Sequence, residues 1–564
     1  MNTKFNVMRL LAVVLMSMAV GRAMAYDIEV ANDDKVPLYY NYINDGRELE
    51  VTYKVRGEGP LTNPPSLPEG FLSGYDGQTE VNVPGEVTYM GRTRKVTAVS
   101  DFAFYHSDIL KKVILPTSVK AIGVGAFALC DSLKTVEGFE YASSLKWNMF
   151  YLSQKLETVK LSEELTEIPT GLFHFCNSLK EIAIPASVKD IRSGVFSGCT
   201  ALKEVTFAEG LETIGSNAFR ECSSLAEITL PESLTQMGNG VFTWCKALKQ
   251  VRIPSKVTTL PPSLFNHCPV LEKVELPEGL TKIDIEAFYC CGALSSVNLP
   301  STLEEIGKDA FFECMSLTDV EMPSNIRILG DRAFYWTGIT TLAIPPSLKS
   351  IGASCFGGCK KMESIAFSEG LEEIGERAFY FPTPNWSPQL KEVVLPASLQ
   401  RLGEKAFENS VELTAVTFKG ATAIGNNAFL SCPKLLTVTS FATEPVAFTG
   451  LGEENPAFTQ DHFYNTTLKI PYGTTSIYKA TGGWKNFTWT EEMEPTGINA
   501  VHSHESVVHS YDNAVYDLQG RQVVHGSQSI VHSPNAPVNS QLSTFNSQLK
   551  SGLYIVDGKK IAIK

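Results

Sequence analysis

The stretch LAEITLPESLTQMGNGVFTWCKAL, from Leu225 to Leu248, decides the fold, because nearly the same pattern returns as LSSVNLPSTLEEIGKDAFFECMSL from Leu294 to Leu317. The shared pattern is L-x-x-V-x-L-P-x-S-L-x-x-I-G-x-x-A-F-x-x-C-x-x-L. Its phenylalanine recurs every 23 residues from Phe104 to Phe334, and with small register changes to Phe429. A period between about 20 and 29 residues with leucines at fixed offsets is typical of a solenoid whose repeats bury apolar side chains by stacking.

The repeat predicts a leucine-rich repeat solenoid of 23-residue coils, each with a short parallel strand and a short helical or 3₁₀ turn. In one coil, Val297 and Leu299 alternate with outward side chains, as a strand on a buried core requires. The next residue, Pro300, cannot donate to a ladder and ends the strand. The glycine that follows, such as Gly307, predicts a corner where a β-carbon would crowd the backbone. The Ala-Phe pair then opens the helical turn, with the phenylalanine pointing into the core.

The N-terminus has the composition of an export signal. Lys4 and Arg9 supply positive charge, Leu10 to Val20 is apolar, and Ala23-Met24-Ala25 fits the small-residue pattern of a cleavage site. The apolar run is too short to span a bilayer as a helix. We therefore expect an exported protein, secreted or on the cell surface with the periplasm as the alternative, and no transmembrane segment in the mature chain.

The segments that flank the repeats lack their pattern, so we expect several parts along the chain. Alternating apolar residues such as ELEVTYKV, Glu48 to Val55, predict a β-rich N-terminal cap. Aromatic residues such as Trp484 and Phe487 predict a last irregular coil that covers the exposed core. The predicted parts are a signal peptide at 1–25, the N-terminal cap at 26–95, the solenoid at 96–440, a C-terminal coil or cap at 441–490, a linker at 491–513 and a C-terminal segment at 514–564.

Composition narrows the classes of partner. The formal net charge is −13, and no cluster of Lys and Arg appears that could bind phosphates. A nucleic-acid partner is therefore not expected, and an acidic membrane surface is disfavoured for the same reason.

Twelve cysteines in an exported chain would ordinarily predict disulfides. Ten of them lie three residues after the repeat phenylalanine and so form one column on successive coils: Cys130, Cys176, Cys199, Cys222, Cys245, Cys268, Cys291, Cys314, Cys359 and Cys432. Side chains in such a column point the same way, which is poor geometry for bridging. Free cysteine packs well as a small hydrophobe. We predict a reduced column in the core, with occasional disulfides as the alternative.

No motif nominates a catalytic nucleophile, a base, a cofactor site or a metal site. Five histidines near the C-terminus could suggest a metal, but His504-Glu505 is followed by His509, one residue too late to share a helix face with the first histidine. They lie in a low-complexity stretch in which Val-His-Ser recurs. The five are His502, His504, His509, His525 and His532. We predict a protein that is not an enzyme and has no cofactor or metal.

The outward position of the predicted strand changes from coil to coil while the inward positions hardly vary. This is what a solenoid with one structural face and one adaptable face would have. The alternative is that these side chains are merely solvated and diverge freely. The candidate protein-binding residues are Thr206, Thr229, Arg252, Glu275, Asn298 and Glu321.

The repeat pattern, with the closing Leu468 to Gly473, Trp484 and Phe487, resembles the BspA-type leucine-rich repeat proteins over about residues 26 to 490. These are surface or secreted proteins of mucosal microbes. The resemblance implies a non-enzymatic protein, and some members are adhesins that bind host matrix proteins such as fibronectin or fibrinogen and promote coaggregation. The family has no fixed site motif from which single binding residues could be carried over.

A second resemblance lies at the C-terminus. Val515 to Arg521 and Gly552 to Lys564 resemble the two strand-rich halves of a type IX secretion sorting domain, here separated by the low-complexity stretch from Val524 to Leu549. The resemblance implies transport across an outer membrane. Together these patterns favour a surface-displayed or secreted solenoid that binds host matrix or bacterial proteins; the alternative is an envelope scaffold without a host ligand.

Overall fold

The computed structural model describes residues 25–55, 71–386, 388–449 and 457–494, and four short strands beyond them. The chain divides into two compact units: residues 1–469 with 476–490, and residues 470–475 with 491–564. Except for Ala25, the predicted signal peptide lies outside the described residues.

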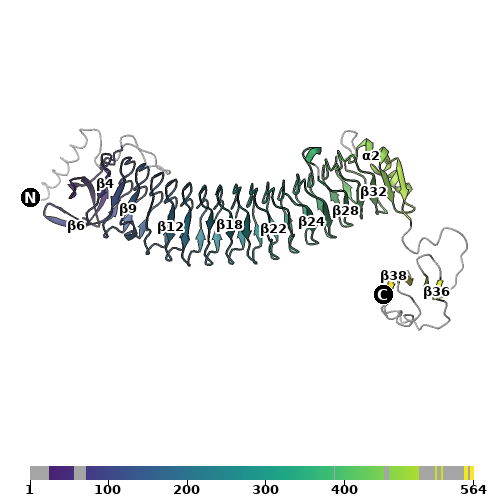
Figure 1. The fold of residues 1–564 in the computed structure, drawn as a ribbon, viewed down its shortest axis with the longest axis horizontal. Coiled ribbons are helices and arrows are strands. Elements are labelled where there is room, and N and C mark those ends of the chain that lie inside the picture. Colours follow the sequence, from purple (N-terminus) through teal and green to yellow (C-terminus); the bar gives the residue numbers. More distant parts are fainter. Residues whose placement is uncertain are drawn as a thin grey trace, which may run out of the picture. The chain divides into compact units, whose positions relative to one another are not determined.

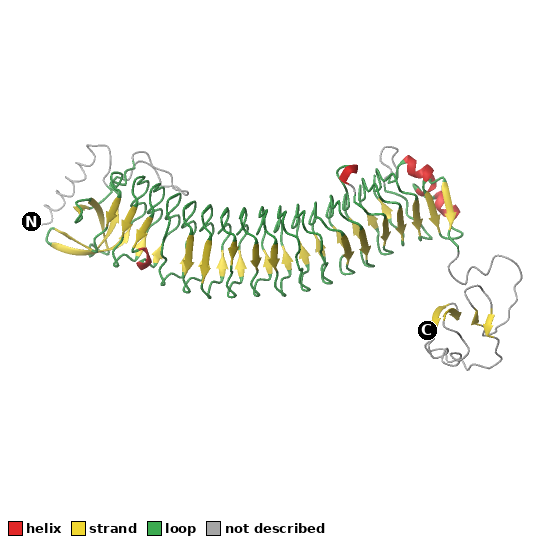
Figure 2. Ribbon diagram, in the orientation of Figure 1, coloured by secondary structure: helices red, strands yellow, loops and turns green. Residues whose placement is uncertain are grey.

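The first unit is a solenoid of stacked coils, as Figures 1 and 2 show. Its short strands form two parallel ladders. The first ladder holds the strand that the sequence predicts, and the second holds a two-residue strand around the isoleucine of the repeat. In the first ladder, β12 (Glu181–Ile184) pairs with β14 (Glu204–Phe207). In the second, β13 (Asp190–Ile191) pairs with β15 (Thr213–Ile214). The predicted leucine-rich solenoid of parallel strands is therefore confirmed.

The remaining strands of the first ladder are β4 (Glu80–Asn82), β7 (Lys112–Ile114), β9 (Thr135–Glu137), β16 (Glu227–Ile228), β18 (Gln250–Arg252), β20 (Lys273–Glu275), β24 (Thr341–Ile344), β26 (Ser364–Phe367), β28 (Glu392–Leu395), β30 (Ala415–Phe418), β32 (Thr437–Ser440), β33 (Thr467–Ile470) and β34 (Trp489–Glu492). Those of the second are β8 (Ala121–Ile122), β10 (Ser144–Leu145), β11 (Glu167–Ile168), β17 (Gln236–Met237), β19 (Thr259–Leu260), β21 (Lys282–Ile283), β22 (Glu305–Ile306), β23 (Ile328–Leu329), β25 (Ser350–Ile351), β27 (Glu373–Ile374), β29 (Arg401–Leu402) and β31 (Ala423–Ile424). Short 3₁₀ segments lie at η1 (Phe139–Tyr141) and η2 (Pro384–Trp386).

The repeat phenylalanines form one stack through the core. Neighbouring rings are nearly parallel; for example, the ring centroids of Phe242 and Phe265 lie 5.5 Å apart at an interplanar angle of 7°. Each ring is fully buried, so every coil adds a large apolar side chain to a continuous interior. This interior grows along one direction only, which is why a long chain can be built without a second core.

The column cysteines are all buried and free, as the packing argument predicts. Each thiol also has a polar role: the Sγ of Cys245 donates to the carbonyl of Phe219 in the preceding coil, 3.1 Å away. Ser153 occupies the same column and donates to the Phe127 carbonyl in the same way, at 2.5 Å. The thiol of Cys245 is thus a second donor to the buried Phe219 carbonyl, which also accepts from the backbone amide of Cys222.

The segment around each phenylalanine differs from the expected helical or 3₁₀ turn. It is a series of hydrogen-bonded turns, with Arg220 N donating to Asn217 O and Cys222 N donating to Phe219 O, both at 3.2 Å. Asn217 and Glu221 have φ of 57° and 61°. A right-handed helix cannot pass through left-handed residues, so two of them four residues apart keep the segment as turns.

Glycine holds neighbouring coils close at the end of the second ladder. A β-carbon on Gly238 would lie 2.4 Å from the backbone nitrogen of Ser216, which confirms the expected crowding. The Gly238 amide donates to Ile214 O at 2.7 Å. Pro169 and Pro261 occupy this position in two coils and have no N–H to donate. The second ladder is broken before each of them, between β10 and β11 and between β17 and β19.

A mixed sheet caps the N-terminal end, as expected. Its strands are β1 (Ile28–Ala31), β2 (Pro37–Ile43), β3 (Glu48–Thr52), β5 (Glu86–Tyr89) and β6 (Arg92–Val99). β2 pairs antiparallel with both β1 and β3, and β3 pairs in parallel with β6. On its other side β6 pairs in parallel with β8, the first strand of the second ladder. The sheet thereby extends the second ladder beyond the first coil.

Aromatic residues close the other end of the stack. Phe458 lies on Phe429 with ring centroids 4.9 Å apart, and Trp484 and Phe487 are buried beside it. These residues come from a segment with α2 (Gln460–Asn465), α3 (Thr475–Ala480) and η3 (Trp484–Asn486). The predicted aromatic cover at Trp484 and Phe487 is therefore present.

Near the C-terminus, β35 (Val515–Tyr516), β36 (Gln522–Val524), β37 (Gly552–Val556) and β38 (Lys559–Ile563) form one sheet in the order β36-β35-β37-β38. Tyr516 pairs with Ile555, so strands from both parts of the predicted sorting segment share this sheet. The tail histidines lie outside the described residues. The sorting-domain interpretation stays a prediction.

Candidate protein-binding face

The outward side chains of the first ladder form a surface that we call the first-ladder face. All six predicted residues lie on it and are exposed, one on each of six successive coils: Thr206, Thr229, Arg252, Glu275, Asn298 and Glu321. Each lies one residue after a buried valine or isoleucine, such as Val251 before Arg252, because successive side chains of a strand point to opposite sides. Arg252 and Glu275 are paired in register on β18 and β20.

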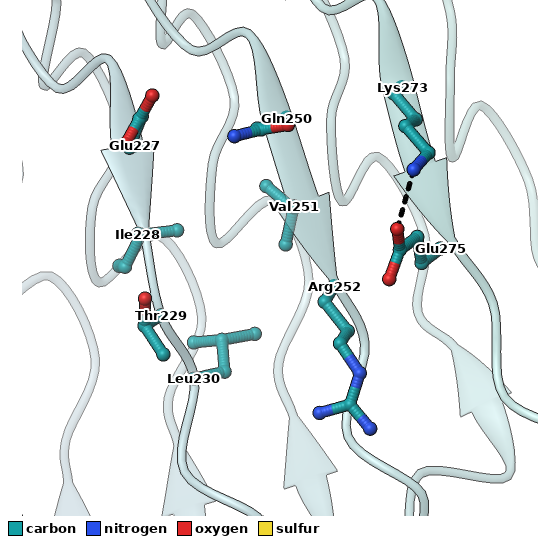
Figure 3. A pocket seen from close by; sticks show the side chains of 9 residues that line it. All are labelled: Glu227, Ile228, Thr229, Leu230, Gln250, Val251, Arg252, Lys273 and Glu275. Carbon is teal, nitrogen blue, oxygen red and sulfur yellow. Dashed lines mark hydrogen bonds and ion pairs between the residues drawn. The ribbon is translucent and has the colours of Figure 1, made fainter.

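Three of the six residues meet in a shallow hollow of about 270 Å³, which we call the central hollow. Figure 3 shows Thr229, Arg252 and Glu275 on three neighbouring strands. Its other lining residues are Glu227, Ile228, Leu230, Gln250, Val251 and Lys273. The hollow thus combines polar and apolar side chains, and its chemistry differs at each strand.

Ion pairs order the charged side chains of the central hollow. The Nζ of Lys273 lies 2.6 Å from a carboxylate oxygen of Glu275 and lowers the pKa of that carboxyl. Arg252 pairs with Glu232 of the preceding coil. Because these groups are at least 43% exposed, each pair contributes little to stability and can exchange its partner for a ligand group.

A larger hollow of about 710 Å³, the N-terminal hollow, lies on the same face. It is lined by residues 158–161, 163, 181–186, 204 and 206–208, so it includes Thr206 but none of the other five predicted residues. Asn298 and Glu321 line neither hollow. The predicted range begins at Thr206 and therefore misses most of the larger hollow. The sequence feature that could have indicated the larger hollow is the short side chain of Ala183 at the outward position of its strand.

A row of aromatic side chains lies along the turns that follow the core phenylalanines, and the sequence pattern did not predict it. Trp244 stacks on His267 with ring centroids 4.0 Å apart, and Tyr289 stacks on Phe312 at 4.7 Å. They occupy the two positions after the core phenylalanine, where the consensus specifies no residue. Their rings face each other from coil to coil, so the row mainly presents ring edges to solvent.

The described ranges contain no group of three or more His, Cys, Asp or Glu side chains placed to hold a metal ion. Burial raises the pKa of the column thiols, to about 12 for Cys268, so these thiols are not activated nucleophiles. Among the same residues, no helix is long and apolar enough to cross a membrane.

A stack of leucine-rich coils with a buried phenylalanine column and one varied strand face defines the class of leucine-rich repeat solenoids. The model of the BspA type leucine rich repeat region matches residues 97–209, 189–306, 281–385 and 383–480, which is more than half of the chain. The chain belongs to this family.

Several solved structures are similar to this chain. A leucine-rich repeat protein from Bacteroides ovatus is 24% identical, with 74% of this chain and 95% of that chain covered and a TM-score of 0.46. A leucine rich cell surface protein from Faecalibacterium prausnitzii is 19% identical, with coverage of 73% and 95% and a TM-score of 0.33. The pneumococcal vaccine antigen PcpA is 19% identical, with coverage of 83% and 100% and a TM-score of 0.33. A search of curated proteins finds no match.

Proposed function

We propose that this chain is a non-enzymatic, exported protein-binding solenoid, secreted or displayed at the cell surface, that contacts host matrix or other bacterial proteins through its first-ladder face. The observation that carries the proposal is the regular placement of different exposed side chains on successive coils of a fixed interior. Solenoid surfaces of this kind are extended and suit large partners.

The interior favours binding because the face is already ordered. Stacked phenylalanines and the cysteine column fix the spacing of the coils, so little backbone freedom is lost when a partner docks. The face also mixes signs of charge, as Lys273 and Glu275 illustrate. Such patterning selects a complementary protein surface rather than a uniformly charged polymer.

The test measures binding of the full chain to purified host matrix proteins and mucins by surface plasmon resonance. A variant with serine at the six predicted positions should lose saturable binding. A matched control changes the exposed second-ladder residues Gln236 and Thr259 to serine and should bind as the native chain does. Unchanged binding by the six-position variant would contradict the proposal.

The envelope scaffold without a host ligand is the alternative, and it makes a different prediction for intact cells. A surface-displayed solenoid is cut by added protease, whereas a periplasmic one is protected until the outer membrane is opened. Protection, together with no binding to any protein tested, would favour the scaffold.

A further inference from the structure

The N-terminal hollow has a floor of short side chains. Ala183 points outward from β12, and it lies between the longer Lys160 and Thr206 of the neighbouring coils. Ala186 and Ala208 line the same hollow after the two strands. Because an alanine fills little of the outward space of its strand, this group leaves a depression whose floor is largely apolar.

The backbone beneath the hollow is interrupted. β12 and β14 form a separate two-stranded sheet in the first ladder, and the preceding strand residue, Thr158, bridges only to Thr135 among the described residues. The second ladder stays paired across the same coils, from Glu167 to Asp190. The hollow therefore lies where one ladder is unpaired and the other holds the coils together, which accounts for its larger volume.

The rim of the hollow is acidic. Its charged lining residues are Lys160 and three carboxylates, Glu163, Glu181 and Glu204. All four are exposed, and the described residues provide no ion-pair partner for the three carboxylates. Lys180 and Lys203 precede two of them but do not line the hollow. An apolar floor with an excess of negative charge is complementary to an apolar side chain beside a positive one.

We propose that the N-terminal hollow is the docking site for an extended segment of a partner protein, in which a leucine- or phenylalanine-sized side chain lies over Ala183 and an adjacent Lys or Arg meets Glu181 or Glu204. This inference rests on the proposed protein-binding function and gives that function a specific site and partner chemistry. The apolar contact provides affinity, and the carboxylates provide selectivity and rate of association.

The experiment uses the full chain and short fluorescent glycine-serine peptides with a central leucine flanked by lysines. Two other peptides carry glutamates as flanks or glycine in place of leucine. Ala183→Arg fills the hollow, and Ala343→Arg is its control, because Ala343 is exposed at the same outward position of β24. We expect the lysine-flanked leucine peptide to bind the native chain, and Ala183→Arg to weaken that binding about tenfold or more while Ala343→Arg leaves it unchanged.

Glu181→Gln with Glu204→Gln should weaken binding of the same peptide and reduce its dependence on salt, because rim charges act mainly through long-range attraction. Circular dichroism checks that each variant folds. The inference is overturned if the native chain binds no peptide, if the glutamate-flanked peptide binds equally well, or if the two arginine variants behave alike. Retained binding of Ala183→Arg to matrix proteins, with loss in the six-position serine variant, would overturn this site while leaving the proposed function intact.

Discussion

The two ladders of the solenoid differ in regularity. The second ladder runs unbroken through eight strands from β19 to β31, and both of its breaks fall at a proline. The first ladder is divided into several separate sheets, although most of its strands are longer. The comparison indicates that the second ladder and the buried columns set the spacing of the coils. The side chains of the first-ladder face can therefore differ from coil to coil without changing that spacing.

The buried phenylalanine column should give the largest effect. Phe242→Ala removes a stacked ring that lies between Phe219 and Phe265, and leaves a cavity that two coils share. We expect a loss of about 3–5 kcal/mol in the free energy of unfolding. Thr229→Ala, at the outward position of the same coil, should change it by no more than about 0.5 kcal/mol. Urea denaturation followed by circular dichroism measures both, and comparable losses would contradict the division between fixed interior and free face.

The glycine column tests whether close approach of coils is needed. A β-carbon on Gly330 would lie 2.5 Å from the backbone nitrogen of Lys308, whereas one on Gly292 would meet no atom within 4 Å. Gly330→Ala should therefore cost about 1–3 kcal/mol through forced displacement of the backbone. Gly292→Ala is the matched control and should be nearly neutral. Equal thermal stabilities of the two variants would show that the second ladder tolerates wider spacing.

The cysteine column tests the polar role of the thiol. Cys245→Ala removes one of two donors to the Phe219 carbonyl, which keeps its bond from the Cys222 amide, so we expect a loss of about 0.5–1.5 kcal/mol for that hydrogen bond. Cys245→Ser keeps a donor, as Ser153 does naturally in this column, and should lose less. Chemical denaturation of both variants under reducing conditions separates the two roles. A larger loss for serine than for alanine would show that apolar packing outweighs the hydrogen bond.

The sequence predicts the interior well because burial repeats the same residue types at fixed offsets. Phe242 and Cys245, for example, belong to columns whose members can be identified from their 23-residue spacing in the sequence. The turns were harder to predict, since Glu221 and Trp244 adopt left-handed backbone conformations without being glycine or asparagine. The short second strand was missed as well, because two residues are too few to give a periodicity of their own.

The candidate face was only partly predictable for a different reason. Periodicity identifies which residues point outward, and all six predicted residues do. A hollow depends on the sizes of side chains on neighbouring coils, such as Ala183 between Lys160 and Thr206, and on where strand pairing stops. Neither property follows from the pattern of one repeat.

The smallest effect on stability, and the sharpest test of the second ladder, is expected from Pro261→Gly. The amide of Gly238 donates to the carbonyl of Ile214 in the preceding coil. Pro261 occupies the corresponding position one coil later and has no amide hydrogen, so it cannot donate to the carbonyl of Met237 in the same way. Glycine would restore a donor worth about 0.5–1.5 kcal/mol, offset by about 0.4–1 kcal/mol from a more flexible unfolded chain. Stability should therefore barely change, while hydrogen exchange should show the new amide at 261 protected like that of Gly238. Pro262→Gly is the control, with no ladder bond to gain. An unprotected amide at 261 would mean that the coils are held apart here by something other than the missing donor.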